Sequence, residues 1–134
     1  MNTPPLLYAG AIAPREAWRM HIDEGAVIVD VRTKPEWEFV GAYPGAAFIE
    51  WRSYGASGPN PHFLAELRSR FSPETTLLFL CRSGGRSHQA ATLAAAAGYP
   101  HAFNILEGFE GEKGPDGRRG HQGWRAAGLP WQQG

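Results

Sequence analysis

The stretch Leu77-Leu-Phe-Leu-Cys-Arg-Ser-Gly-Gly-Arg-Ser87 places the single cysteine of the chain between an apolar run and a loop with two arginines and two glycines. The apolar residues before Cys81 predict a buried strand, and the alanine-rich run 89–97 predicts a helix closed by Gly98. Strand, tight loop and helix in this order are typical of α/β folds, in which active sites lie where strands end and helices begin. Cys81 is therefore a candidate nucleophile.

Similar elements lie on both sides of this stretch. The β-branched run 26–31 predicts a buried strand with Asp30 at its carboxyl end, and Thr33 followed by Pro35 predicts the cap and first turn of a short helix. The predicted strands cover 26–31, 46–49, 75–80 and 102–106, and the predicted helices cover 13–22, 33–41, 61–71 and 89–97. Because strands and helices alternate with short connections, the sequence predicts an α/β fold with a mostly parallel sheet.

Length and composition limit the class of protein. The 134 residues suffice for one domain, 1–134, with its own core. Thirteen basic and thirteen acidic residues give no net charge, which argues against broad binding of nucleic acid or of a membrane. With one cysteine and no metal-ligand spacing among the histidines, we expect no metal and no other cofactor. Without a signal peptide or a run of ~20 apolar residues, we expect a cytoplasmic protein.

The loop after Cys81 has the composition of an anion cradle. The first turn of a helix carries unpaired N–H groups and the positive end of the helix dipole. Gly84 and Gly85 let the chain curl tightly enough for several N–H groups to point inward. We expect this cradle to stabilise Cys81 as the thiolate, which is the reactive form of the side chain.

The side chains of the loop suit the same purpose. Arg82 and Arg86 are the only formally charged residues in the segment 75–106, so this segment places a positive field at the sulfur. Both offer fork-shaped donors to a doubly charged oxyanion or thio-oxyanion. Ser83 and Ser87 offer hydroxyl donors or a cap for the helix. These residues predict an anion-binding site beside the nucleophile.

Two other interpretations apply to Cys81. A lone cysteine at the end of an apolar strand is often an inert core residue, and only the loop and helix that follow favour a functional one. A protease dyad would require a histidine beside the sulfur. The nearest, His88, is expected to point along the helix, so proteolysis has little support.

The segment 108–123 differs from the rest of the chain, because glycine recurs at every third position. This spacing imitates the period of collagen, but the run is short and holds only one proline, Pro115. We expect a charged loop instead. An alternative interpretation is a lid from which Arg118, Arg119 or His121 reaches a substrate. A solvated loop is the simpler interpretation of the same residues.

Taken together, these residues resemble the rhodanese family of sulfurtransferases. The resemblance rests on the cysteine loop, on Val29-Asp-Val-Arg32 with Glu36-Trp-Glu38 and Gly41, on Pro44-Gly-Ala46, and on the closing stretches 106–109 and 123–130. These motifs span nearly the whole chain in the order of the family. The chain departs from the family pattern at 42–43, where Ala-Tyr replaces the frequent His-Ile.

The resemblance implies a five-stranded parallel sheet flanked by helices on both faces, and a persulfide mechanism. In that mechanism the Cys81 thiolate takes the outer sulfur of a small donor such as thiosulfate and passes it to a thiophilic acceptor. Cyanide or a thiol, including a protein thiol, is the implied acceptor. The backbone amides of 82–87 would hold the persulfide and the two arginines would orient the donor, while Asp30 and Arg32 would support the structure near the loop.

Two rival functions follow from the same features. A phosphatase or arsenate reductase also uses a cysteine in an anion cradle, but enzymes of that style place arginine six positions after the cysteine. Arg86 lies five positions after Cys81, which favours a smaller loop around a sulfur atom. A non-catalytic module with this fold would dock a partner, but such modules usually lack the nucleophile.

Overall fold

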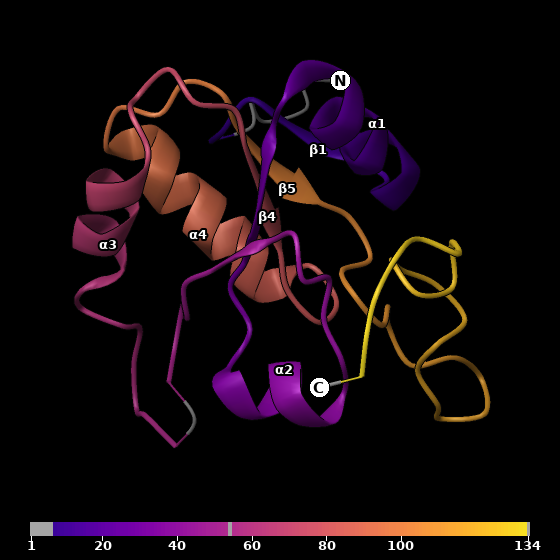
Figure 1. The fold of residues 1–134 in the computed structure, drawn as a ribbon. Helices are drawn as coiled ribbons and strands as arrows, with labels where there is room; N and C mark the ends of the chain where they lie inside the picture. Colours follow the sequence, from indigo (N-terminus) through magenta and orange to yellow (C-terminus); the bar gives the residue numbers. More distant parts are fainter. Residues whose placement is uncertain (1–6, 54, 134) are drawn as a thin grey trace, which may run out of the picture.

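A five-stranded parallel sheet lies at the centre of the structure, with helices packed against it (Figure 1). The computed structural model describes residues 7–53 and 55–133. Within them the strands are β1 (Gly10–Ile12), β2 (Val27–Asp30), β3 (Ala47–Phe48), β4 (Leu77–Leu80) and β5 (Ala102–Ile105). The helices are α1 (Pro14–Glu24), α2 (Lys34–Phe39), α3 (Phe63–Arg70) and α4 (Gly85–Ala96).

The order of the strands brings the cysteine to the middle of one sheet edge. The strands lie in the order β1-β5-β4-β2-β3, and each pair of neighbours is parallel. Because parallel strands end at the same edge of a sheet, the residues that follow β2, β4 and β5 meet there. Cys81 directly follows the central strand β4. The predicted α/β fold with a parallel sheet is confirmed.

Side chains of β4 alternate between two cores, one on each face of the sheet. Leu77, Phe79 and Cys81 belong to the core that α3 and α4 cover. Leu78 and Leu80 belong to the core on the other face, which contains residues of α1 and of the carboxyl-terminal segment. The expectation of helices on both faces is thus confirmed, and the alternation points the Cys81 side chain towards the face of α4.

Short sequence signals set the ends of the first two helices. α1 ends at Gly25, which adopts a left-handed conformation with φ of 72°. α2 begins in a capping box, as Thr33 predicts. In this box the hydroxyl of Thr33 accepts the N–H of Glu36, and the carboxylate of Glu36 accepts the N–H of Thr33.

The start of α4 differs from the prediction. The helix begins at Gly85 and not at residue 89, so Arg86 and Ser87 lie in its first turn. Its cap is Gly84, with φ of 114° and no side-chain cap, so of the two roles considered for the serines the helix cap does not apply. Glycine tolerates this backbone conformation without steric cost, so the chain turns directly from the strand into the helix.

The sequence also fails to predict β1, which is three residues long and pairs with β5 at the edge of the sheet. The segment 108–123 contains no helix or strand, and the stretch that follows it packs on the domain. Trp124 is fully buried there, with its ring packed against Trp18 and Tyr43.

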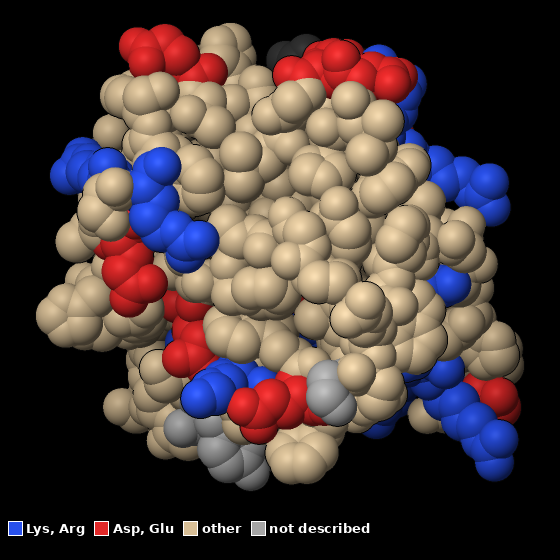
Figure 2. All heavy atoms as spheres, in the orientation of Figure 1, with Lys and Arg blue, Asp and Glu red and all other residues tan. Residues whose placement is uncertain are grey.

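None of the helices within the described residues is long and apolar enough to cross a membrane. On the face in Figure 2, basic and acidic side chains lie near one another around the edge.

Candidate active site

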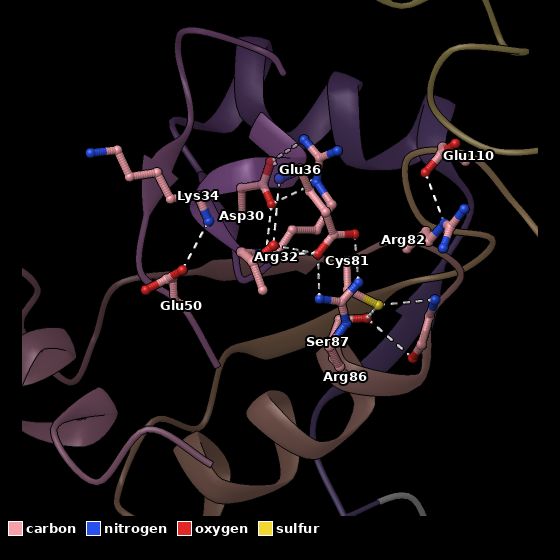
Figure 3. Close-up of polar contacts among 12 residues, drawn as sticks. Asp30, Arg32, Lys34, Glu36, Glu50, Cys81, Arg82, Arg86, Ser87 and Glu110 are labelled. Carbon is pink, nitrogen blue, oxygen red and sulfur yellow. Dashed lines mark hydrogen bonds and ion pairs between the residues drawn. The ribbon is translucent and has the colours of Figure 1, made fainter. Parts of the chain in front are cut away.

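Two donors from its own loop and helix lie within hydrogen-bonding distance of the sulfur of Cys81 (Figure 3). The N–H of Gly84 lies 3.1 Å from Sγ, and the hydroxyl of Ser87 lies 3.3 Å from it. Cys81 is buried, with only 1% of the residue exposed. Burial alone would also suit an inert core cysteine. An amide aimed at the sulfur from a helix cap is what distinguishes a thiolate site from such a residue.

Asn104 belongs to this network, although the sequence analysis did not single it out. Its side-chain oxygen lies 2.5 Å from the hydroxyl of Ser87, which is also 3.1 Å from the carbonyl of Gly84. Asn104 lies on β5 beside Phe79 of β4 and is almost fully buried. Asn104 could have been singled out in the sequence as a polar amide within an otherwise apolar strand, because buried polar groups need hydrogen-bond partners.

Arg86 is held by a carboxylate from α2. Its Nη1 and Nη2 atoms lie 2.7 and 2.9 Å from the two oxygens of Glu36, which is a bidentate pair (Figure 3). Burial opposes ionisation of Glu36, but hydrogen bonds from Arg86 and Thr33 prevail and lower its pKa to about 2. The hydrogen bonds to Glu36 raise the pKa of Arg86 against its burial, and the charges of Glu36, Cys81 and Asp30 add to this effect.

Arg82 is held by a second carboxylate, from the carboxyl-terminal segment. Its Nε lies 3.0 Å from Glu110, whose side chain is 9% exposed, and Figure 3 shows Arg82 pointing towards this partner. Arg125 approaches the other oxygen of Glu110 at 3.9 Å. The positive field expected from the segment 75–106 is therefore incomplete as a description of the site, because the fold brings acidic residues from elsewhere to both arginines.

Asp30 and Arg32 form a fully buried ion pair beneath the loop, with Nη2 and Oδ2 2.8 Å apart. The guanidinium of Arg32 also donates to the carbonyl of Gly41 at 2.9 Å and stacks on the ring of Phe109 at 4.1 Å. Phe109 in turn donates its N–H to the carbonyl of Cys81 at 2.7 Å. This continuous set of contacts links the buried pair to the backbone of the nucleophile.

Residues 107–111 pack against the start of the cysteine loop. Glu110 and Gly111 donate their N–H groups to the carbonyl of Arg82, at 3.0 and 3.2 Å. Gly108 has φ of 63°, and a Cβ there would lie 2.5 Å from the backbone of Arg82. Glycine is required at this position both for its conformation and for its close approach.

The comparisons with known proteins show the family of the chain. The family described as Rhodanese-like domain matches residues 13–113. The chain belongs to this family. A crystal structure of Rv0390 from M. tuberculosis matches this rhodanese-like chain with a TM-score of 0.86 and 46% sequence identity, covering 95% of this chain and 99% of that one.

Two curated relatives cover most of the rhodanese-like chain as well. The uncharacterized protein RP600 of Rickettsia prowazekii is 35% identical over 127 residues, which is 90% of this chain and 95% of that protein. Thiosulfate sulfurtransferase GlpE of Actinobacillus succinogenes is 28% identical over 121 residues, which is 90% of this chain and 88% of the relative.

Ser83, Gly85 and His88 are the other predicted residues on or near the loop. Ser83 and Gly85 complete the loop and the start of α4. His88 turns to Tyr8, with Nδ1 2.7 Å from the hydroxyl, as expected for a residue that does not serve the sulfur.

The three residues named for a lid bond within their own segment of the rhodanese-like domain. Arg119 donates to the carbonyl of Gly111, the N–H of Arg118 donates to Asp116, and the ring of His121 contacts the same aspartate. Among the described residues, these hydrogen bonds stay within the segment 108–123.

Proposed function

We propose that this rhodanese-like protein is a sulfurtransferase that carries a sulfane sulfur on Cys81. In the first step the Cys81 thiolate attacks the outer sulfur of a donor such as thiosulfate. The sulfur–sulfur bond of the donor breaks, sulfite leaves with the electron pair, and a Cys81 persulfide forms. In the second step cyanide or a thiol takes the outer sulfur and the thiolate returns.

The observation that carries this proposal is the pair of donors aimed at the sulfur. The N–H of Gly84 and the hydroxyl of Ser87 lie at hydrogen-bonding distance from Sγ, at the start of α4. Hydrogen bonds to an ionised sulfur are stronger than those to a neutral thiol, so both donors favour the thiolate and the persulfide anion. The backbone amides of 82–87 are the further groups proposed to hold the outer sulfur.

The proposed roles of the neighbouring side chains follow from their contacts. Asp30 and Arg32 support the loop through Phe109 and are not proposed to touch the substrate. The name of the GlpE relative, a thiosulfate sulfurtransferase, supports the same chemistry for this chain.

A phosphatase is the weaker candidate. Its arginine would have to be free to bind a phosphoryl group, whereas Arg86 is held in a bidentate pair by Glu36. Assaying phosphate release from p-nitrophenyl phosphate beside sulfur transfer separates the two functions. We expect sulfur transfer without phosphate release.

Turnover of Cys81→Ser tests the proposal. Thiocyanate formation from thiosulfate or methanethiosulfonate with cyanide is measured for wild type and variant, and circular dichroism checks that the variant is folded. We expect ping-pong kinetics in wild type and no turnover in the variant, because serine cannot form a persulfide. Equal turnover by the two proteins would remove Cys81 from the mechanism.

A further inference from the structure

Asn104 of β5 competes with the sulfur of Cys81 for a single proton. The hydroxyl of Ser87 lies 2.5 Å from the side-chain oxygen of Asn104, 3.1 Å from the carbonyl of Gly84 and 3.3 Å from Sγ. A hydroxyl donates one hydrogen bond at a time. The contact with the amide is the shortest of the three and lies within the range for a hydrogen bond between two oxygens. Asn104 is therefore the preferred acceptor of this hydroxyl.

The orientation of the Asn104 amide is set by its second contact. Its Nδ2 lies 3.4 Å from the carbonyl oxygen of Gly84, which accepts hydrogen bonds and donates none. The nitrogen therefore faces Gly84 and the oxygen faces Ser87. In this orientation the amide takes the proton of the hydroxyl and offers none in return.

Burial gives this competition an energetic cost. Ser87 is fully buried and Asn104 is 5% exposed. When the hydroxyl turns to the sulfur, the amide oxygen loses its donor inside the protein, and leaving a buried acceptor unpaired is unfavourable. The turn is favoured only when the sulfur is charged, because hydrogen bonds to charged acceptors are stronger than those to neutral ones.

We propose that Asn104 is a positioning residue for sulfur transfer, which holds the proton of Ser87 while the sulfur of Cys81 is uncharged and yields it when that sulfur ionises. The inference rests on the proposed sulfurtransferase function. In the persulfide anion the charge lies on the outer sulfur, so Sγ is neutral and the hydroxyl returns to Asn104. The backbone amides of 82–87 are then the donors for the outer sulfur. The asparagine thus makes the hydroxyl follow the charge through the two steps of the reaction.

Asn104→Leu removes the competing acceptor without changing any charge. Leucine has the same number and branching of side-chain heavy atoms as asparagine, but it neither accepts nor donates a hydrogen bond. The charged and titratable groups around the sulfur are the same in wild type and variant. They are Arg86, whose charge interacts with that of Cys81, Arg82 of the loop, the Asp30–Arg32 pair, Glu36 on α2, Glu110 of the carboxyl-terminal segment, and His88 with its partner Tyr8.

The rate at which iodoacetamide alkylates Cys81 is measured against pH, since the thiolate is the form that reacts. Four proteins are compared, namely wild type, Asn104→Leu, Ser87→Ala and the variant with both substitutions, and circular dichroism checks that each is folded. We expect the midpoint of the profile to fall by about 0.5–1 pH unit in Asn104→Leu, because the hydroxyl then donates to the sulfur at no cost to a buried amide.

The double variant separates this role from a merely structural one. In the Ser87→Ala background, Asn104→Leu should move the midpoint by less than about 0.2 pH unit, because no hydroxyl proton remains to compete for. A structural asparagine predicts the opposite sign, since a loosened loop would donate less well to the sulfur and the midpoint would rise. An unchanged or raised midpoint in Asn104→Leu, or an equal fall in both backgrounds, would overturn the inference.

Wild type provides a second measurement that serves if Asn104→Leu does not fold. The ¹³C resonance of the side-chain carbonyl of Asn104 should shift with the same midpoint as the alkylation rate, and should shift much less in Ser87→Ala. No shift in wild type, or an equal shift in both proteins, would overturn the inference. Neither measurement uses a sulfur donor. A wild type that gives the expected profiles but takes up no sulfur from thiosulfate or methanethiosulfonate would overturn the proposed function and leave the competition for the proton in place.

Discussion

The hydroxyl of Ser87 has one proton and three acceptors within reach. These are the sulfur of Cys81 at 3.3 Å, the carbonyl of Gly84 at 3.1 Å and the amide oxygen of Asn104 at 2.5 Å. A single hydroxyl donates one hydrogen bond at a time. When the sulfur is ionised, donation to it becomes the stronger choice, so Ser87 is placed to respond to the charge of the nucleophile.

Ser87→Ala is predicted to slow persulfide formation about tenfold or more, because a hydrogen bond to a charged group contributes about 1.5–3 kcal/mol. The rate of sulfur loading measures this. Ser83→Ala is the matched control, since Ser83 lies in the same loop while Ser87 is the serine that contacts the sulfur. Equal loading rates in Ser87→Ala and wild type would show that the hydroxyl does not assist the sulfur.

At the scale of elements, α2 connects helix capping to the cysteine loop. Its capping box orients Glu36, and Glu36 orients Arg86 at the start of α4. The lowered pKa of Glu36, about 2, makes this connection sensitive to acid. A carboxyl whose pKa is lower in the folded than in the unfolded state stabilises the fold above the unfolded value and loses that contribution as the pH falls.

The free energy of unfolding should therefore show a Glu36 contribution of up to about 3 kcal/mol at neutral pH. It is predicted to decline between about pH 4.5, the ordinary value, and about pH 2. Urea unfolding of wild type and Glu36→Gln across this range measures it, and the two stabilities should converge at the acidic end. Glu38→Gln should differ little from wild type at any pH. A constant gap between wild type and Glu36→Gln would show that the pair does not titrate as described.

At the scale of the whole molecule, the carboxyl-terminal segment is part of the site, because it contacts the backbone of the cysteine loop. Residues 109–111 donate their N–H groups to the carbonyls of Cys81 and Arg82, and Trp124 anchors the stretch that follows by filling the core beside α1. Figure 1 shows this segment, in orange and yellow, returning to the side of the sheet near α1. The site thus depends on contacts between the cysteine loop and the carboxyl-terminal segment.

Gly108→Ala tests that dependence. The added Cβ would lie 2.5 Å from the backbone of Arg82 at a φ of 63°, so we predict a loss of about 3 kcal/mol or more in stability and a strong loss of sulfur transfer. Thermal unfolding and turnover measure both. Gly117→Ala is the control, because its φ of 77° is similar but no atom lies within 4 Å, and it should cost only about 1–2 kcal/mol. Similar losses in both variants would mean that strain alone, and not contact with the loop, explains Gly108.

Most of the fold could be predicted because its signals are local. The apolar run that becomes β4, the glycine that ends α1 and the cap formed by Thr33 act within a few residues of themselves. β1 could not be predicted, since three residues without a β-branched run form a strand only through pairing with β5. The start of α4 was misplaced because the backbone turn at Gly84 replaces a side-chain cap.

The nucleophile and its hydrogen-bond donors could be predicted from the sequence, but the carboxylates that pair with the two arginines could not. Cys81 and its donors Gly84 and Ser87 lie within one short stretch of sequence. Glu36 and Glu110, by contrast, are separated from their arginine partners by 50 and 28 positions. The sequence alone does not say which carboxylates the folded chain will bring to the loop, so the loop appears more cationic in the sequence than it is in the structure.

The intact mass of the protein after exposure to a sulfur donor tests the persulfide mechanism most directly. Wild type incubated with methanethiosulfonate and desalted should gain one sulfur atom, which cyanide should then remove as an equal amount of thiocyanate. Cys81→Ser, which has no other cysteine, should gain none. No added sulfur in wild type, or the same gain in Cys81→Ser, would contradict a sulfurtransferase that works through this residue.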